Sequence, residues 1–199
     1  MVQELWLSGF FVVGFAAIHI FIGRLYFLDI IPRSRLLSAS SGVAVTYVFL
    51  HVLPLLSEAQ HEINQTKFLV KFFERHVYLV ALIGLIFFYG IERRVRSARQ
   101  TGEMERGHPI QNPVFWLRFS AFAVYNVLIG YLLLYPMEPR YKNIWLYFLA
   151  IGLHFVSSDF GLRKDHVFQY DAYGRWILAG SVLMGWAIGL VVVIPDPVV

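Results

Sequence analysis

Six apolar stretches, separated by short polar segments, run along the 199-residue chain. A helix needs about 20 apolar residues to cross the hydrocarbon core of a bilayer, because each residue advances it by about 1.5 Å. The pattern therefore predicts an all-α integral membrane protein, a bundle of six transmembrane helices. The predicted spans cover residues 5–27, 35–57, 76–91, 115–135, 143–161 and 173–194.

The composition points to the same class of protein. Hydrophobic residues make up 58% of the chain and charged residues 15%, whereas a soluble domain has about 25% charged residues. We therefore expect a single transmembrane domain over residues 1–199, embedded in the lipid bilayer of a cell (inner) membrane. The net charge of +4 predicts no nucleic-acid partner, because Lys and Arg collect in membrane-protein loops near the cytoplasmic leaflet.

The distribution of positive charge predicts the orientation in the membrane. Of the 17 Lys and Arg residues, twelve lie nearest the loops that follow spans 1, 3 and 5, and five lie in the other two loops. Loops rich in Lys and Arg stay in the cytoplasm. The flexible, polar 92–114 loop is therefore expected in the cytoplasm, and both chain termini are expected outside.

The residue types also limit the chemistry. The chain has no cysteine, which excludes disulfides, thiolate metal sites and a cysteine nucleophile. The sequence shows no Ser-His-Asp set, no nucleotide-binding loop and no paired carboxylates within a span. We therefore expect that the protein is not an enzyme.

The candidate functional groups are the polar side chains inside the spans, because a charge at the centre of a membrane helix costs at least ~2.5 kcal/mol. These side chains are His19, His51, Asn126, His154 and Asp159. Asn126 and His154 each lie eleven residues into a span, about 16 Å deep, and both reach the midplane, where transporters commonly bind substrates. We predict that these two side chains face each other inside the bundle.

Two of the candidates allow further expectations about the helices. His51 is expected on the same interior face, nearer the outer surface, where Pro54 should kink its helix. Asn126 and Gly130 together form a small and polar helix face, which is also typical of simple helix–helix packing.

Three segments resemble the ZIP family of metal-ion transporters. Residues 51–54 read His-Val-Leu-Pro, similar to the His-Leu-Leu-Pro-Glu pattern that ends the family's second helix. Residues 125–130 read Tyr-Asn-Val-Leu-Ile-Gly against His-Asn-x-x-Asp/Glu-Gly, and residues 154–159 read His-Phe-Val-Ser-Ser-Asp against His-Glu-x-Pro-His/Glu-Glu. The resemblance implies a divalent metal ion such as zinc as the transported substrate. Its candidate ligands are His154, Asn126, Asp159 and His51.

The chain departs from the family pattern at the positions that would bind metal. Tyr125 and Ile129 stand where the family has a His and a carboxylate, Phe155 replaces a Glu, and Ser158 replaces a His or Glu. The family also has eight spans, against the six predicted here. A divalent metal site normally needs three or four nitrogen or oxygen ligands. The expected function is therefore a divergent ZIP-like transporter with a weakened or lost metal site.

Two other functions stay open at this stage. The lost ligands also fit a membrane scaffold that transports nothing. His19 and His154 lie at comparable depths, so they could supply the two axial ligands of haem in an electron-transfer subunit. The sequence leaves open whether the protein forms a homodimer.

Overall fold

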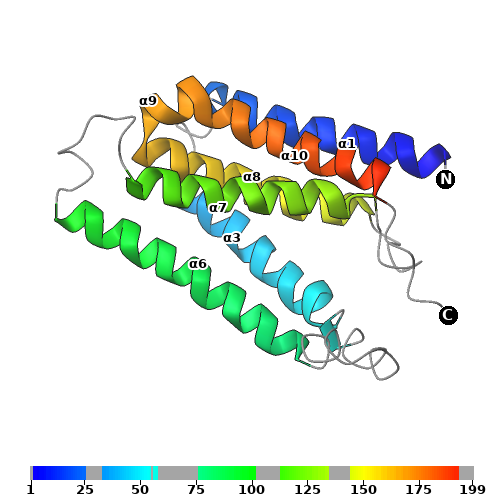
Figure 1. The fold of residues 1–199 in the computed structure, drawn as a ribbon, viewed down its shortest axis with the longest axis horizontal. Helices are drawn as coiled ribbons and strands as arrows, with labels where there is room; N and C mark the ends of the chain where they lie inside the picture. Colours follow the sequence, from blue (N-terminus) through cyan, green and yellow to red (C-terminus); the bar gives the residue numbers. More distant parts are fainter. Residues whose placement is uncertain are drawn as a thin grey trace.

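The computed structural model describes residues 2–25, 33–54, 56–57, 76–101, 113–134 and 144–192. Within these residues the regular elements are all helical, and consecutive long helices run in opposite directions (Figure 1). The all-α class is therefore confirmed. The six helices of fifteen residues or more are α1 (Val2–Phe21), α3 (Arg33–Tyr47), α6 (Val77–Gln100), α7 (Pro113–Leu132), α8 (Ile144–Asp165) and α10 (Arg175–Val191).

Four helical segments are long and apolar enough to cross a membrane. They are Leu5–Arg24, Pro113–Leu132, Trp145–Asp165 and Val167–Val191. The helices of the second and third predicted spans also form, but their apolar parts are shorter. The apolar stretch that begins in α3 is limited to Ser38–Leu50, and charged residues begin at Glu92 within α6.

The prediction of a flexible loop over residues 92–114 is wrong for its first part. Helix α6 continues through Gln100 and adds charged residues to an apolar helix. The segment after Ile91 contains four Arg, one Glu, one Ala and one Gln, which are strong helix formers, and the next glycine is Gly102. Polarity shows where a span leaves the membrane, but it does not end a helix.

Four short helical elements join the long ones. A 3₁₀ helix, η1 (Ile22–Arg24), extends α1, and the short helix α9 (Val167–Gln169) leads through the π-helical turn η5 (Tyr170–Gly174) into α10. A second π-helical turn, η2 (Val48–Val52), follows α3. It lies just before Pro54, whose ring nitrogen has no hydrogen to donate to the preceding turn. The chain thus departs from α-helical geometry beside Pro54, and the kink expected there stays a prediction.

Helices α1, α7, α8 and α10 lie side by side and form the core of the protein (Figure 1). Helices α7 and α10 approach most closely, through glycines that face the partner backbone. A Cβ added to Gly130 would collide with the carbonyl oxygen of Val182, and one added to Gly185 would collide with that of Val127. The small helix face predicted around Gly130 therefore does pack helices together.

Two apolar clusters fill this four-helix bundle. The first contains Phe11 and Phe15 of α1 and Phe155 of α8. The second lies one to two turns further along the same helices and contains Ile22 and Leu162. Between the two clusters, both α1 and α8 carry a buried polar residue, His19 and Asp159.

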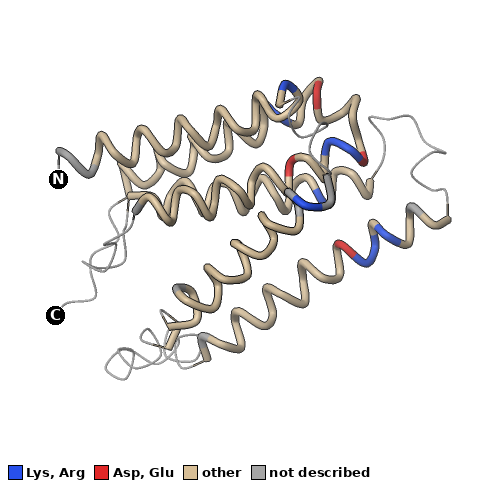
Figure 2. The backbone as a smooth tube through the Cα atoms, turned by 180° about the vertical axis from the view of Figure 1, so that it is seen from behind, with Lys and Arg blue, Asp and Glu red and all other residues tan. Residues whose placement is uncertain are grey.

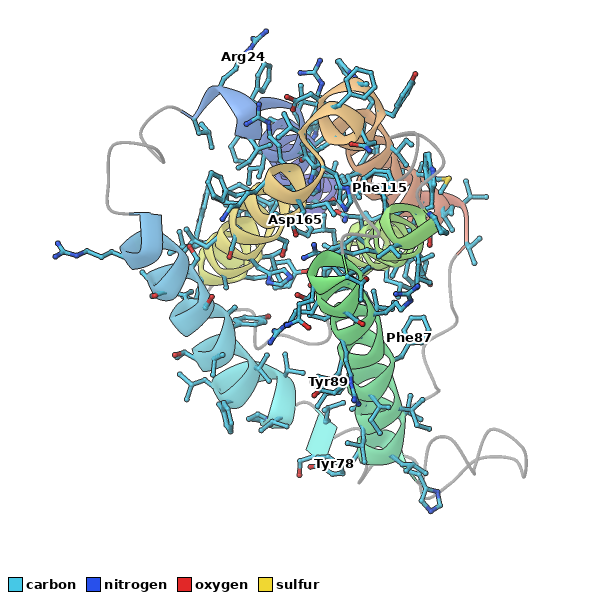
Figure 3. All side chains as sticks on the ribbon, turned by 90° about the vertical axis from the view of Figure 1, so that its left-hand side faces the viewer. Arg24, Tyr78, Phe87, Tyr89, Phe115 and Asp165 are labelled. Carbon is cyan, nitrogen blue, oxygen red and sulfur yellow. The ribbon has the colours of Figure 1, made fainter. Side chains whose placement is uncertain are left out.

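Helices α3 and α6 lie outside the bundle. The charged half of α6 contacts α7 through a small cluster that includes Ile91, Val95 and Val114, and Arg118 of α7 lies 3.4 Å from the Glu92 carboxylate. Its other half, from residue 78 to residue 90, is exposed at every position. In Figure 3 α6 projects away from the bundle, with Tyr78 at its far end.

The described charged residues gather at one end of the helices (Figure 2). We call this the charged end; it is where α1 and α8 finish, near Arg24 and Asp165, and where α7 and α10 begin. Arg118 donates to Asp165 there at 2.8 Å and so joins α7 to α8. The described helix ends next to the loops predicted to be richest in Lys and Arg therefore lie at the same end of the molecule.

Candidate functional site: a buried polar centre

Four polar side chains from different elements meet inside the bundle. They are His19 of α1, Asn126 of α7, Asp159 of α8 and Tyr170 of η5, and we call them the polar centre. Their exposed fractions are 0%, 1%, 2% and 0%, respectively. Apolar clusters lie on both sides of the centre along the bundle axis, so each polar atom must find its partner within the protein.

Short hydrogen bonds connect the four side chains. His19 Nδ1 lies 2.6 Å from Asp159 Oδ2, and His19 Nε2 lies 2.7 Å from Asn126 Oδ1. The Tyr170 hydroxyl donates to Asp159 Oδ2 at 2.7 Å and lies 3.1 Å from the backbone oxygen of His19. The imidazole of His19 therefore bridges α7 and α8.

The position of Asn126 shows which atoms donate. Its Nδ2 group donates to the carbonyl oxygen of Phe122 at 2.8 Å. A flipped amide would place two oxygens against each other there, so Oδ1 must face His19. His19 Nε2 must therefore donate to Asn126 Oδ1. The Phe122 carbonyl fixes the orientation of the Asn126 amide, and this orientation requires a proton on His19 Nε2.

The second ring nitrogen of His19 also faces an oxygen. Nδ1 and Asp159 Oδ2 can approach to 2.6 Å only with a proton between them. Tyr170 donates to the same oxygen, which stabilises the ionised carboxylate and places that proton on His19. This geometry favours an imidazolium–carboxylate pair with no net charge.

We predict that both ring nitrogens of His19 carry a proton in the folded protein. The physical reason is that each faces an oxygen acceptor within 2.7 Å. Nitrogen-15 NMR of histidine-labelled protein in lipid should show one histidine with both ring nitrogens in the protonated range. The signal is assigned by its loss in His19→Gln. A neutral, single-tautomer spectrum for His19 would contradict the proposed protonation state.

The predicted pairing of Asn126 with His154 is wrong, because His19 takes the expected place of His154. His154 is half-buried, and its ring stands edge-on to the Tyr125 ring with the centroids 5.8 Å apart. Its Nε2 atom lies 3.4 Å from the Ser158 hydroxyl. His154 remains within electrostatic reach of Asp159, but it lies beside the polar centre and not in it.

The predicted metal ligands are thus only partly brought together. Asn126 and Asp159 meet through His19, His154 lies apart, and the side chain of His51 lies outside the described residues. Among the residues that the structure describes, no group of three or more His, Asp or Glu side chains could hold a metal ion. The ZIP-like metal set therefore stays a prediction.

The haem alternative receives no support from this arrangement. An axial ligand must offer a free ring nitrogen to iron. Both ring nitrogens of His19 are hydrogen-bonded to Asp159 and Asn126, and the ring packs against Phe155 with the centroids 4.7 Å apart. Haem binding at His19 would require the centre to come apart.

Sequence reasoning missed one member of the centre, Tyr170, which precedes the sixth predicted span. It listed His19 among the polar candidates inside the spans but gave it no partner within the protein. The signal for His19 was its depth. It lies five residues before Arg24 at the end of its span, and Asp159 lies six residues before Asp165. Residues at equal depth on adjacent helices can pair.

No protein-family model matches this chain, and neither a curated protein nor a solved structure matches it. The geometry of the polar centre is therefore the basis for the functional argument.

Proposed function

We propose that the protein is a proton-coupled membrane transporter whose coupling proton binds at the polar centre. The observation that carries the proposal is His19, fully buried and hydrogen-bonded to Asp159 at 2.6 Å and to Asn126 at 2.7 Å. Ionisable groups inside membrane spans are rare, and they commonly belong to ion pathways and proton relays. This class of protein fits both the helical architecture and the buried ionisable pair.

The arrangement couples the proton to helix packing. His19, Asn126 and Asp159 belong to α1, α7 and α8, so the protonated imidazole holds three helices together. If His19 loses its second proton, one ring nitrogen faces an oxygen with no hydrogen between them. The repulsion favours a separation of α1 from a neighbouring helix. A proton that binds one helix arrangement better than another shifts the equilibrium between them, as coupled transport requires.

The proposal includes six membrane crossings, with α3 and α6 joining the four longer spans. The alternating direction of the six helices supports it, because successive spans must run in opposite directions. The charged end would face the cytoplasm, which places both termini outside and residues 92–114 inside. The membrane would be the cell (inner) membrane.

The proposed cargo is a divalent cation, with zinc as the probe. Nδ1 and Oδ2 of the His19–Asp159 pair are 2.6 Å apart. A tetrahedral Zn²⁺ ion bound to both atoms would need each of them about 2 Å away, and hence a separation of about 3.3 Å between Nδ1 and Oδ2. The proton and the cation therefore cannot bind at this position at the same time. An exchanger needs such mutually exclusive binding of its two ions.

Proton flux into liposomes tests the proposal. The purified protein is reconstituted with a pH-sensitive dye in the lumen, and a potassium diffusion potential or external Zn²⁺ supplies the driving force. We expect a lumenal pH change that His19→Gln and Asp159→Asn reduce to the rate of protein-free liposomes. The matched control is His76→Gln, at the start of α6, which should retain the flux. A wild-type protein that is no faster than empty liposomes under either driving force would contradict the proposal.

A further inference from the structure

A second polar layer lies next to the centre, one helical turn nearer the charged end. Arg163 follows Asp159 by four residues on α8, and Gly23 follows His19 by four residues along α1 and η1. Residues four apart lie on the same helix face, about one turn from each other. The centre and this second layer therefore follow one another along the same faces of α1 and α8.

The second layer contains a bidentate ion pair between Arg163 and Asp171. Arg163 donates through Nε to Asp171 Oδ1 at 2.7 Å and through Nη2 to Oδ2 at 2.8 Å. The guanidinium also lies against the backbone of Gly23, where an added Cβ would come within 3.1 Å of Arg163 Nε. The pair thus lies across the ends of α1 and α8.

The two layers are linked through adjacent residues of one turn. Tyr170 and Asp171 are neighbours in the π-helical turn η5. Tyr170 reaches the Asp159 carboxylate, and Asp171 reaches Arg163. Helix α8 and η5 are therefore joined twice, and η5 cannot move away from Arg163 without pulling the Tyr170 hydroxyl from Asp159. Single π-helical turns of this kind are frequent at functional sites.

Exposure differs between the layers. Arg163 and Asp171 are 32% and 38% exposed, whereas His19 and Asp159 are 0% and 2% exposed. The neighbouring positions on the same helices, Ile22 and Leu162, belong to an apolar cluster that excludes water. The partly exposed ion pair therefore lies between the buried polar centre and the charged end.

We propose that Arg163 and Asp171 form the gate of the polar centre toward the charged end, and that they position Tyr170 on Asp159. This inference rests on the proposed function. While the pair is closed, Tyr170 covers Asp159 and no water reaches the His19 proton. When the pair opens, η5 moves away, and the proton passes from His19 to water that reaches the Asp159 carboxylate.

A single reporter cysteine measures the opening directly, because the natural chain contains none. Ile22→Cys places the thiol at a buried position, 3% exposed, in the cluster that also contains Tyr170. Labelling by a water-soluble maleimide should be slow in this variant. Adding Asp171→Asn should raise the rate roughly fivefold, the shift expected when a partly exposed ion pair is lost.

Two further variants separate the gate from general destabilisation. Exchanging the charges, Arg163→Asp with Asp171→Arg, should restore slow labelling. Asp165→Asn breaks a different ion pair at the same end, that with Arg118, and should leave the labelling rate unchanged. Proton flux in liposomes should rise in Asp171→Asn. It should return to the wild-type rate in the variant with exchanged charges.

The outcomes distinguish the gate from the proposed function. Wild-type proton flux with a labelling rate that Asp171→Asn does not change would overturn the gate and leave the transporter proposal standing. Equal acceleration by Asp165→Asn, or no recovery in the charge exchange, would also overturn the gate. Fast labelling in Asp171→Asn together with no wild-type flux would refute both the transporter and the proton route.

Discussion

Replacing Gly185 by alanine is expected to destabilise the protein strongly. The new Cβ would collide with the carbonyl oxygen of Val127 in the facing helix. A backbone atom cannot rotate away as a side chain can, so α7 and α10 must separate. We expect a loss beyond the ~1–3 kcal/mol that an extra methylene costs in a packed core. The reciprocal change, Gly130→Ala, should behave similarly because its Cβ would meet Val182.

Thermal unfolding in detergent, followed by circular dichroism, measures this effect. The matched control is Gly180→Ala, five residues earlier on the same helix, where an added Cβ meets nothing within 4 Å. Alanine is favoured over glycine in a helix by roughly 0.5–1 kcal/mol, so this control should be neutral or slightly more stable. Equal unfolding temperatures for Gly185→Ala and Gly180→Ala would refute the close approach of α7 and α10.

The helices were predictable because their physical cause is local. A run of apolar residues must leave water, and its length decides whether it can cross a bilayer. The exact ends were less predictable. Glu92 marked the end of the apolar run, yet α6 continued to Gln100 because nothing there opposes a helix. The last span began at Val167 and not at residue 173, because η5 keeps the chain helical through Asp171 and Gly174.

The polar centre was harder to predict because it depends on which helices touch. The sequence singled out Asn126 and Asp159 but placed Asn126 opposite His154, because each of these two residues lies eleven residues from the start of its predicted span. Tyr170 gave no signal, since a tyrosine near the end of a span is usually an interfacial anchor. Only the π-helical turn brings its hydroxyl to Asp159.

Replacing Asp159 by leucine is expected to have the second large effect. The change would leave the His19 imidazolium buried without a counter-ion, and it would remove an acceptor from Tyr170. Removing one partner of a buried ion pair costs about 3–5 kcal/mol. Asp159→Leu should therefore unfold at a much lower temperature, or at a much lower denaturant concentration, than the wild type. Circular dichroism in mixed micelles measures both.

Replacing the centre as a whole should have the opposite effect on stability. The triple variant His19→Leu, Asn126→Leu, Asp159→Leu removes both charges and the amide together. Tyr170 can still donate to the backbone oxygen of residue 19, 3.1 Å away in the natural protein. Apolar replacements of buried ion pairs are often neutral or stabilising by about 1–4 kcal/mol. We expect the triple variant to be at least as stable as the wild type, and far more stable than Asp159→Leu.

The comparison of these two variants decides why the chain keeps charged groups in its interior. If the triple variant is stable but carries no protons in liposomes, stability does not explain the polar centre, and proton transfer does. If it is less stable than Asp159→Leu, the hydrogen bonds hold the bundle together, and a non-transporting scaffold becomes the better account. If it is stable and still carries protons, the route lies elsewhere, and His154 with Ser158 becomes the site to test.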